Sequence, residues 1–512
     1  MITNGIGRKI PEEIKGIGKL KPYKGAFKTV PVGNKIAPKI ACKKRGETKI
    51  INSLKEAVKK AGIRDGMTVS FHHHLRNGDY VVAMVLDLLA DLGIKNLTIA
   101  PTALFPVHKS IIKHIENGVV SSIQGSVNGP IGEISSRGVF DIPVVLRSHG
   151  GRARAIEAGD IKIDIAFIAA PSADNYGNLN GIEGPSACGS LGYTMTDAMY
   201  ADKVIAITDH LVDYPLSPIS IPQIYVDYVV KVDEIGDPKG ITSGTLEITK
   251  NPLRLVIAQK AVQVIEASGL LQDGFSLQAG AGGTSLAVTK FMGEKMEKRG
   301  IKGSFGSGGI TGYFVKMLKK NLFNTLFDVQ SFDLEAVRSL KMNPNHLEMS
   351  ASFYANPHNK GCLVNNLDAV ILGATQIDSD FNVNVNTESN GLLLHGIGGH
   401  MDTAAGAKLT IIATPLLRGR MPIVVDKVIT VTTPGETVDV LVTERGIAVN
   451  PARKDLIEKF REARLPMKNI QDLRNEVYDL TGIPEEPHFT DKIIGLVEYR
   501  DGTIIDVIRG VK

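Results

Sequence analysis

The chain of 512 residues is poor in the residues that mark disulfide-rich and zinc-binding proteins. It has three cysteines, no tryptophan and an aromatic content of only 5%. The cysteines are Cys42, Cys188 and Cys362. Because none of them forms a Cys-x-x-Cys pair, the sequence predicts neither a disulfide framework nor a zinc site. A reducing cytoplasmic location fits this usage best.

Long hydrophobic runs and an excess of one charge are also missing. The longest apolar candidate, 81–92, is broken by Asp87 and Asp91 and is shorter than the roughly 18–20 residues that cross a bilayer. The first 45 residues lack the apolar core of a secretory signal. The net charge of +5 is small beside 59 basic and 54 acidic residues, so neither a membrane nor a nucleic-acid partner is expected.

What the chain does contain is an internal repeat. Four polar residues, the first just before a short apolar run and the others after it, recur at an offset of 204 positions. Asp164, Asp174, Asn178 and Asn180 reappear as Asp368, Asp378, Asn382 and Asn384. Two further echoes flank them: 65–67 matches 273–275, and 226–230 matches 425–429. Three matches in the same order predict two similar domains in tandem, with a site between them.

Short apolar runs alternate with segments of helical periodicity from residue 50 onward. This alternation predicts an α/β fold in which each domain is a mainly parallel sheet with flanking helices. We expect the first domain over 46–248 and the second over 249–512, with the junction near 242–252. Residues 1–45, rich in Lys, Arg and Pro, are predicted to form an extended basic arm. That arm is either a solvated tail or a strap that wraps a neighbouring subunit or contacts an acidic partner.

Three glycine-rich clusters lie in the second predicted domain. In open α/β sheets, ligands bind beyond the carboxyl ends of the strands, where glycine admits a ligand to the backbone and a helix N-terminus offers N–H groups. We therefore predict a backbone-lined pocket for a phosphate or thioester oxygen, with tight turns as the alternative. Neither a dinucleotide fingerprint nor a P-loop is present. The predicted binding residues are Gly280, Gly282, Gly283, Thr284, Gly306, Ser307, Gly308, Gly309, Gly398, Gly399 and His400.

Three consecutive histidines, 72–74, follow a predicted strand. Since neighbours on a strand face opposite sides, all three cannot reach one ion, and no metal site is predicted. A histidine at the rim of a pocket is the preferred interpretation. Arg76 is predicted to clamp a substrate carboxylate, with a surface ion pair as the alternative. Ser148 and His149 are neighbours in the chain, and the side chains of adjacent residues rarely face each other. The sequence therefore does not predict a serine–histidine dyad of a hydrolase.

Several longer strings are far more specific than any glycine motif. They are DGMTVSFHH at 65–73, SHGGR at 148–152, GSLGY at 189–193, NPNH at 343–346, GGHMDT at 398–403 and TERGIAVNP at 443–451. On these strings the chain resembles, from about residue 40 onward, the alpha subunits of citrate lyase. It is more widely similar to the CoA-transferases, and this resemblance implies two similar CoA-transferase-type domains.

The resemblance implies a transferase that exchanges acetate for citrate on a thioester: acetyl-carrier plus citrate gives citryl-carrier plus acetate. It implies no cofactor bound tightly by this chain. The thioester is carried by a small acyl-carrier gamma subunit with a CoA-like phosphoribosyl-dephospho-CoA arm, for which acetyl-CoA is a surrogate. A beta subunit then cleaves the citryl-carrier, so an oligomeric complex is expected.

The chain departs from the wider superfamily where a glutamate nucleophile would stand. The matching segment, 306–309, contains no carboxylate, and Glu388 lies too far along the chain, so we interpret it as surface or pocket rim. The hypothesis is that no enzyme ester forms, and that citrate's own carboxylate attacks the acetyl thioester to give a mixed anhydride. The candidate oxyanion donors are the N–H groups of Gly282, Gly283, Gly308 and Gly309, and Arg76 or Arg152 would bind citrate.

Two alternatives stay open. One is a CoA-transferase or thioester hydrolase for another acid, citramalate being the closest, which an assay over a panel of acids would separate. The other is a regulatory subunit that senses a nucleotide or sugar phosphate. Such a subunit would bind its ligand tightly but would not transfer an acyl group.

Overall fold

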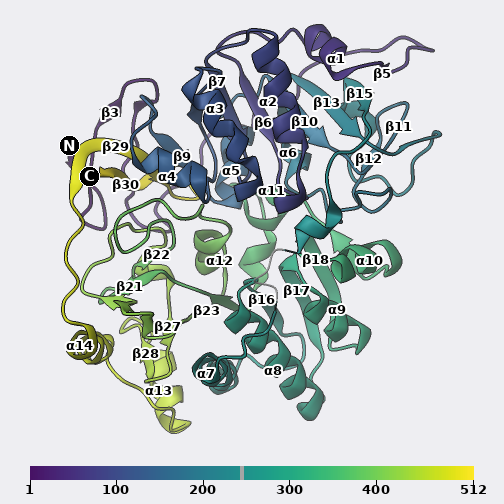
Figure 1. Cartoon of the computed structure of the whole chain (residues 1–512). Helices are drawn as coiled ribbons and strands as arrows, with labels where there is room; N and C mark the ends of the chain where they lie inside the picture. The colour runs from purple at the N-terminus through teal and green to yellow at the C-terminus, as the bar shows by residue number, and fades with distance from the viewer. Residues whose placement is uncertain (243–246) are drawn as a thin grey trace.

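The computed structural model describes residues 1–242 and 247–512, which form two large α/β domains stacked one on the other (Figure 1). Residues 243–246, part of the predicted junction at 242–252, lie outside the described residues. Among the helices of the described segments, none combines the length and hydropathy needed to cross a membrane. The boundaries at 45/46 and 248/249 stay predictions.

The first large sheet has seven parallel strands in the order β5-β15-β13-β10-β6-β7-β8. These strands are β5 (Ile50–Ile51), β6 (Thr68–Phe71), β7 (Leu97–Pro101), β8 (Val120–Ile123), β10 (Ile165–Ala169), β13 (Lys203–Thr208) and β15 (Tyr228–Lys231). Its helices include α1 (Leu54–Ala61), α2 (Val81–Asp91), α3 (Ile111–Glu116), α4 (Pro130–Ser136), α5 (His149–Glu157) and α6 (Thr194–Tyr200). Strand β10 is buried along its whole length, as expected for a parallel strand covered on both faces.

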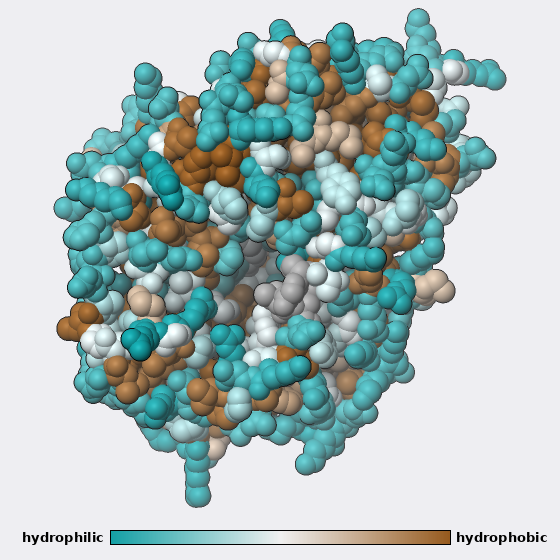
Figure 2. Space-filling view, viewed as in Figure 1, coloured by the Kyte–Doolittle hydropathy of each residue, from teal (hydrophilic) through white to brown (hydrophobic). Residues whose placement is uncertain are grey.

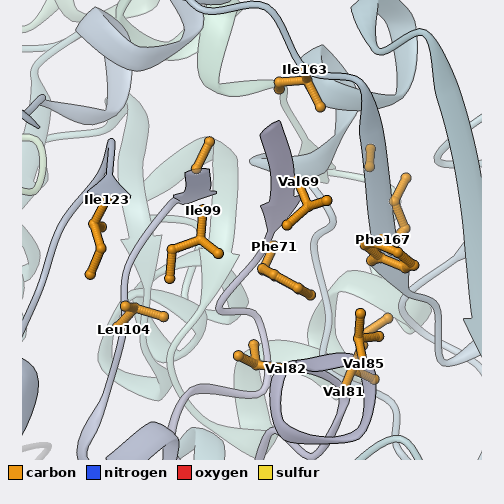
Figure 3. Close-up of a cluster of buried hydrophobic side chains, with 14 of the residues drawn as sticks. Val69, Phe71, Val81, Val82, Val85, Ile99, Leu104, Ile123, Ile163 and Phe167 are labelled. Carbon is orange, nitrogen blue, oxygen red and sulfur yellow. The ribbon is translucent and has the colours of Figure 1, made fainter. Parts of the chain in front are cut away.

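Aliphatic and aromatic side chains hold helix α2 against this sheet. Figure 3 shows Val81, Val82 and Val85 of α2 beside side chains of the central strands. Phe71 at the end of β6 stacks on Phe167 of β10 with ring centroids 5.6 Å apart. All five side chains are almost completely buried, so each stabilises the fold by roughly 1.5–3 kcal/mol.

The second large sheet has eight strands in the order β19-β18-β17-β16-β20-β23-β27-β28, all parallel except β28. These strands are β16 (Ser276–Ala279), β17 (Gly303–Ile310), β18 (Phe323–Ser331), β19 (His346–Glu348), β20 (Ala369–Leu372), β23 (Leu409–Ala413), β27 (Val440–Val442) and β28 (Ile447–Val449). Its helices include α7 (Pro252–Ser268), α8 (Gly283–Arg299), α9 (Gly312–Lys319), α10 (Leu334–Met342), α11 (Ala351–Ala355), α12 (His400–Gly406), α13 (Lys454–Glu462) and α14 (Ile470–Thr481).

The internal repeat corresponds to equivalent hydrogen bonds in the two domains. The Asp164 carboxylate accepts the N–H of Thr68 at 2.8 Å, and the Asp368 carboxylate accepts the N–H of Ser276 at the same distance. Each aspartate thereby ties the start of one central strand, β10 or β20, to its neighbour, β6 or β16. The prediction of two similar tandem α/β domains with mainly parallel sheets is confirmed.

The third echo was matched to the wrong segment. The Asp227 carboxylate accepts the N–H of Val204 at 3.0 Å beside β15, whereas Asp439 accepts the N–H of Thr410 at 2.7 Å beside β27. Residues 226–230 therefore correspond to 438–442 rather than to 425–429. Asp426 instead pairs with Arg474. The second domain has two extra short strands between β23 and β27, namely β24 (Leu417–Arg418) and β25 (Met421–Pro422). The following β26 (Val424–Val425) is the counterpart of β14 (Leu211–Val212) in the first domain.

The C-terminal end of the chain belongs to a small sheet against which the N-terminal segment packs. The hairpin of β29 (Phe489–Glu498) and β30 (Ile504–Val511) pairs with β9 (Val144–Leu146) of the first domain. Ile10 and Leu20 of the predicted arm pack with Val145, Leu496 and Ile504 in a buried cluster. A solvated tail is therefore wrong for the first part of the arm, because its spaced apolar side chains have a surface to cover.

Glycines let the two domains approach each other at backbone distance. A Cβ on Gly150 of α5 would collide with the carbonyl group of Ala355 at the end of α11. A Cβ on Gly192 would likewise meet the carbonyl group of Met349. Because a carbonyl oxygen of the backbone cannot move aside as a side chain can, these positions require glycine.

We expect Gly150→Ala to separate the domains locally and to lower stability by about 1–3 kcal/mol, the usual range for overpacking. The measurement is the apparent Tm from thermal unfolding. The control is Gly361→Ala, because a Cβ at that exposed glycine would meet no atom within 4 Å. Equal melting temperatures of the two variants would contradict a tight backbone contact at Gly150.

Candidate active site at the domain interface

The carboxyl ends of strands from both sheets meet where the domains touch. The carbonyl group of His73, just beyond β6, accepts a hydrogen bond from Nε2 of Gln330, near the end of β18, at 2.9 Å. The Arg76 guanidinium lies over the rings of Phe105 and Phe332, at 5.4 and 4.8 Å from their centroids. Figure 2 shows the surface hollowed between the two domains. We call this region the interdomain site.

A buried carboxylate latches the domains together at this site. Asp402 in α12 accepts hydrogen bonds from Oγ of Ser148 at 2.8 Å and from the N–H of Gly150 at 2.9 Å. Both donors belong to the N-terminus of α5 in the other domain. His149 lies between these two donors in the chain, and its N–H donates to the carbonyl oxygen of Gly398 at 2.9 Å. The latch therefore places the His149 side chain beside the glycine loop that precedes α12.

Two of the predicted glycine clusters are joined through the end of β20. The loop 280–284 leads from β16 into α8, and its Gly280 N–H donates to the carbonyl oxygen of Ile371 at 3.2 Å. Gly373 follows β20, and its carbonyl oxygen lies 2.9 Å from Nε2 of His400. His400 also contacts Oγ1 of Thr433 through Nδ1 at 2.7 Å. Both nitrogens of this buried imidazole are thus used to hold the loop before α12 in place.

The cluster 306–309 is not a loop, as the sequence was interpreted, but part of strand β17. Its ladder with β18 is irregular between Gly308 and Gly309, and Gly308 has a φ of +99°. A Cβ on Gly306 would lie 2.6 Å from the Phe314 ring, so this glycine makes room for packing. Glycine at a strand position marks close approach as often as a turn, which the sequence pattern could not distinguish.

This strand is nevertheless connected to the other clusters by side chains. A Cβ on Gly308 would lie 2.7 Å from the side chain of Gln278 in β16. Nε2 of Gln278 donates to the hydroxyl oxygen of Tyr354 at 2.6 Å. A Cβ on Gly399 would lie 2.6 Å from that same hydroxyl group. The structure therefore brings all three predicted clusters into one region, and adds Gln278 and Tyr354, which no motif pointed out.

A stack of rings forms the opposite side of the site. Tyr193, from the GSLGY string, lies 4.8 Å from His73 and 4.4 Å from His149 between ring centroids. Burial lowers the pKa of both imidazoles, that of His149 to about 3, and raises the pKa of Tyr193. All three rings are therefore uncharged at neutral pH. The string GSLGY was noticed for its resemblance, but nothing in it indicated the ring contact.

The other two histidines of 72–74 stack on each other, with ring centroids 5.8 Å apart. His73 stacks instead on His149 and Tyr193, and the His74 ring also lies 6.3 Å from that of Tyr193. The three histidines follow β6 rather than belong to it. Within the described residues, no group of three or more His, Cys, Asp and Glu side chains is arranged to hold a metal ion.

Arg152 is committed to a buried ion pair and cannot serve as the citrate clamp considered from the sequence. Its guanidinium donates to both carboxylate oxygens of Asp197, at 2.7 and 2.6 Å, and to the carbonyl oxygen of Ala100 at 2.7 Å. Breaking such a pair would leave an uncompensated buried charge, at several kcal/mol. Arg76 remains the candidate: it is partly exposed between two rings, and burial lowers its pKa.

Glu388 lies in a tight turn that precedes the glycine loop before α12 in the chain. Its N–H donates to the carbonyl oxygen of Leu392 at 2.8 Å, and its own carbonyl oxygen accepts the N–H of Gly391 at 2.9 Å. The residue is partly exposed, and a Cβ on Gly391 would meet the ring of Phe489 in the C-terminal hairpin. The interpretation of Glu388 as surface or rim stays a prediction.

Comparison with known proteins shows similarity over almost the whole chain. A family model described as citrate lyase, alpha subunit, matches residues 47–511. The citrate lyase alpha chain of Klebsiella pneumoniae is 51% identical over 467 residues, which cover 91% of this chain and 92% of that protein. The corresponding chain of Escherichia coli is 48% identical over 470 residues, 92% of each.

Solved structures agree. A Streptococcus mutans protein described as an alpha subunit of citrate lyase, in complex with citrate, has a TM-score of 0.96 at 48% identity and covers 99% of this chain and 100% of that chain. A chain of a Pseudomonas malonate decarboxylase hetero-tetramer has a TM-score of 0.64 at 18% identity, covering 86% and 95%. The latter likeness concerns the fold alone. The sequence-based resemblance is confirmed.

The buried histidines predict a loss of stability in mild acid. Burial lowers the pKa of His72, His73 and His74 well below the ordinary value, so the unfolded chain binds protons that the folded chain does not. Stability should be fully present above about pH 6.5 and fall as the pH drops below it, by about 1.4 kcal/mol per pH unit for each histidine.

The measurement is the dependence of the apparent Tm on pH between neutral and mildly acidic buffers. His74→Asn should make the apparent Tm less dependent on pH, because the unfolded variant takes up one proton fewer than the unfolded wild type. The exposed His488→Asn is the matched control and should leave it unchanged. Identical pH profiles of wild type and His74→Asn would contradict the assignment of His74 as a buried neutral group.

Proposed function

Because the chain belongs to the citrate lyase alpha-subunit family, we propose that it converts acetyl-carrier and citrate into citryl-carrier and acetate. The carrier is a gamma subunit with a phosphoribosyl-dephospho-CoA arm, and a beta subunit cleaves the citryl-carrier. The chain itself holds no tightly bound cofactor, and the complex is oligomeric and cytoplasmic. The observation that carries the proposal is the family match over 47–511, to which the convergence of the predicted glycine clusters adds support.

The reaction is an acyl exchange without an enzyme ester. An oxygen of a citrate carboxylate attacks the carbonyl carbon of the acetyl thioester, the C–S bond breaks, and the carrier thiolate leaves. This gives a mixed anhydride of citrate and acetate. The thiolate then attacks the citryl carbonyl carbon, the C–O bond breaks, and acetate leaves. No net proton is gained or lost, so the site has to supply position and charge stabilisation rather than acid–base chemistry.

The residues of the interdomain site fit these needs. The N-terminus of α8, at Gly282 and Gly283, offers N–H groups to the oxyanion of each tetrahedral intermediate, and one such donor contributes about 3–4 kcal/mol. Arg76 offers the cation for a carboxylate of citrate. The uncharged rings of His73, His149 and Tyr193 exclude water, which protects the anhydride from hydrolysis. Holding both reactants together lowers the barrier by roughly 7–11 kcal/mol.

Citrate is favoured over citramalate because a relative of 48% identity, from Streptococcus mutans, was solved in complex with citrate. The decisive assay mixes the purified chain with labelled acetate and acetyl-CoA as surrogate carrier, with citrate or citramalate added. Citrate should drive incorporation of label into acetyl-CoA at least about tenfold faster than citramalate. A faster rate with citramalate would reassign the substrate, and tight ligand binding without exchange would favour the regulatory alternative.

Glu388→Ala should retain most of the exchange activity, because the proposed nucleophile is a carboxylate of the substrate. We expect kcat/KM to stay within about threefold of wild type. Glu485→Ala, at an exposed glutamate of the linker before β29, is the matched control. A roughly thousandfold loss specific to Glu388→Ala, or a covalent adduct trapped on Glu388, would instead identify an enzyme nucleophile.

A further inference from the structure

Charge is segregated strongly along this chain. Twelve of the 59 basic residues but only two of the 54 acidic residues fall within 1–45. This segment therefore has a net charge of +10, whereas the remaining residues together have a net charge of −5. The modest overall charge hides a concentrated positive region, which is the pattern of a surface that attracts an acidic partner.

The second part of this region runs along the surface with its side chains outward. Every residue from Phe27 to Thr48 is exposed, and none belongs to a helix or strand. Apolar side chains are among them: Val30, Val32 and Ile40 are 78%, 92% and 97% exposed. We call residues 19–48 the basic strip. Apolar side chains this exposed, in a segment rich in lysine, are typical of an interaction site.

Four lysines of the basic strip surround a hollow of about 550 Å³. These are Lys19, Lys21, Lys24 and Lys28. No ion pair joins any of the four to a carboxylate in the described part of the chain, whereas Lys39 pairs with Asp202 at 3.2 Å. Their charges therefore repel one another, and an anionic partner would relieve this repulsion.

The strip is held in one position by contacts with both domains. The hydroxyl group of Tyr23 donates to Glu436 of the second domain at 2.6 Å. Thr29 donates to Asp501 in the C-terminal hairpin at 2.5 Å. The N–H of Ile36 donates to the carbonyl oxygen of Glu157, the last residue of α5, at 2.8 Å. A fixed strip binds with less loss of conformational entropy than a free tail.

We propose that the basic strip is the docking surface for the acyl-carrier subunit. This inference rests on the proposed function, which requires a thioester carrier whose arm bears phosphate groups. The lysines would bind the anionic carrier, and Val32 and Ile40 would contact its surface. A membrane is disfavoured, because Pro31, Gly33 and Pro38 prevent the amphipathic helix with which such segments bind lipid.

The test measures binding of the fluorescently labelled carrier subunit, with its arm attached, to the full chain by anisotropy. The variant combines Lys19→Gln, Lys21→Gln, Lys24→Gln and Lys28→Gln. Its Kd should rise at least about tenfold at low salt, and the difference should shrink as salt is added. Val32→Ser with Ile40→Ser should weaken binding with little salt dependence, since these residues carry no charge.

The matched control replaces four exposed lysines outside the strip, Lys55, Lys59, Lys298 and Lys454, by glutamine, and its Kd should stay within about twofold of wild type. An equal change in both quadruple variants, or none in either, would overturn the proposal. So would a lower oligomeric mass of the strip variant in sedimentation, which would assign the strip to contacts between copies. Binding of the wild type to vesicles of equal parts phosphatidylcholine and phosphatidylglycerol, lost in the strip variant, would assign it to lipid.

Acetate exchange with acetyl-CoA separates this proposal from the proposed function. At saturating acetyl-CoA, the strip variant should exchange acetate at the wild-type rate, because the strip lies outside the interdomain site and its lysines act on binding rather than on the reaction. If the wild type exchanges acetate but Kd for the carrier is insensitive to the strip, the docking proposal fails alone. If the wild type binds the carrier through the strip but exchanges no acetate, the proposed function fails alone.

Discussion

The buried carboxylate of Asp402 is the constraint on which the interdomain site depends. A carboxylate removed from water is tolerated only when its oxygens are hydrogen-bonded, and here both accept donors from the N-terminus of α5, with Arg500 3.6 Å away. The donors lie at the N-terminus of α5 and the acceptor lies in α12, so helices rather than loops hold them in place. This latch fixes the N-terminus of α5 against α12, so His149 and Gly398 from different domains become neighbours.

The electrostatic character of the site follows from the same burial. Imidazoles that would titrate near neutrality in water are held uncharged, and the hydroxyl group of Tyr193 keeps its proton. Arg76 and the positive end of the α8 dipole supply the charge that the proposed reaction uses, whereas the Arg152 guanidinium is neutralised by Asp197. An uncharged wall opposite a few directed donors suits an acyl transfer that must avoid water.

The sequence predicted those features that depend on local pattern. The repeat, the parallel sheets and the loop 280–284 follow from periodicity and from glycine before a helix, and the structure has them. The errors arose where the partner of a residue lies far away in the chain. Arg152 meets Asp197 through the fold, the glycines of 306–309 meet aromatic rings, and Ile10 meets a strand almost five hundred residues later. The pair Gln278 and Tyr354 belongs to no motif, so only the fold could bring it forward.

The packing of β17 bears on the identity of the nucleophile. The resemblance to the wider CoA-transferases implies a glutamate nucleophile at the place of 306–309. Here a Cβ on Gly306 would press on Phe314 and one on Gly309 would collide with Phe332, while Gly308 combines a φ of +99° with contact to Gln278. A side chain as large as glutamate therefore has no room at any of these three glycines. The packing of the strand therefore excludes an enzyme carboxylate at these three positions, which supports the proposal that the attacking carboxylate comes from the substrate.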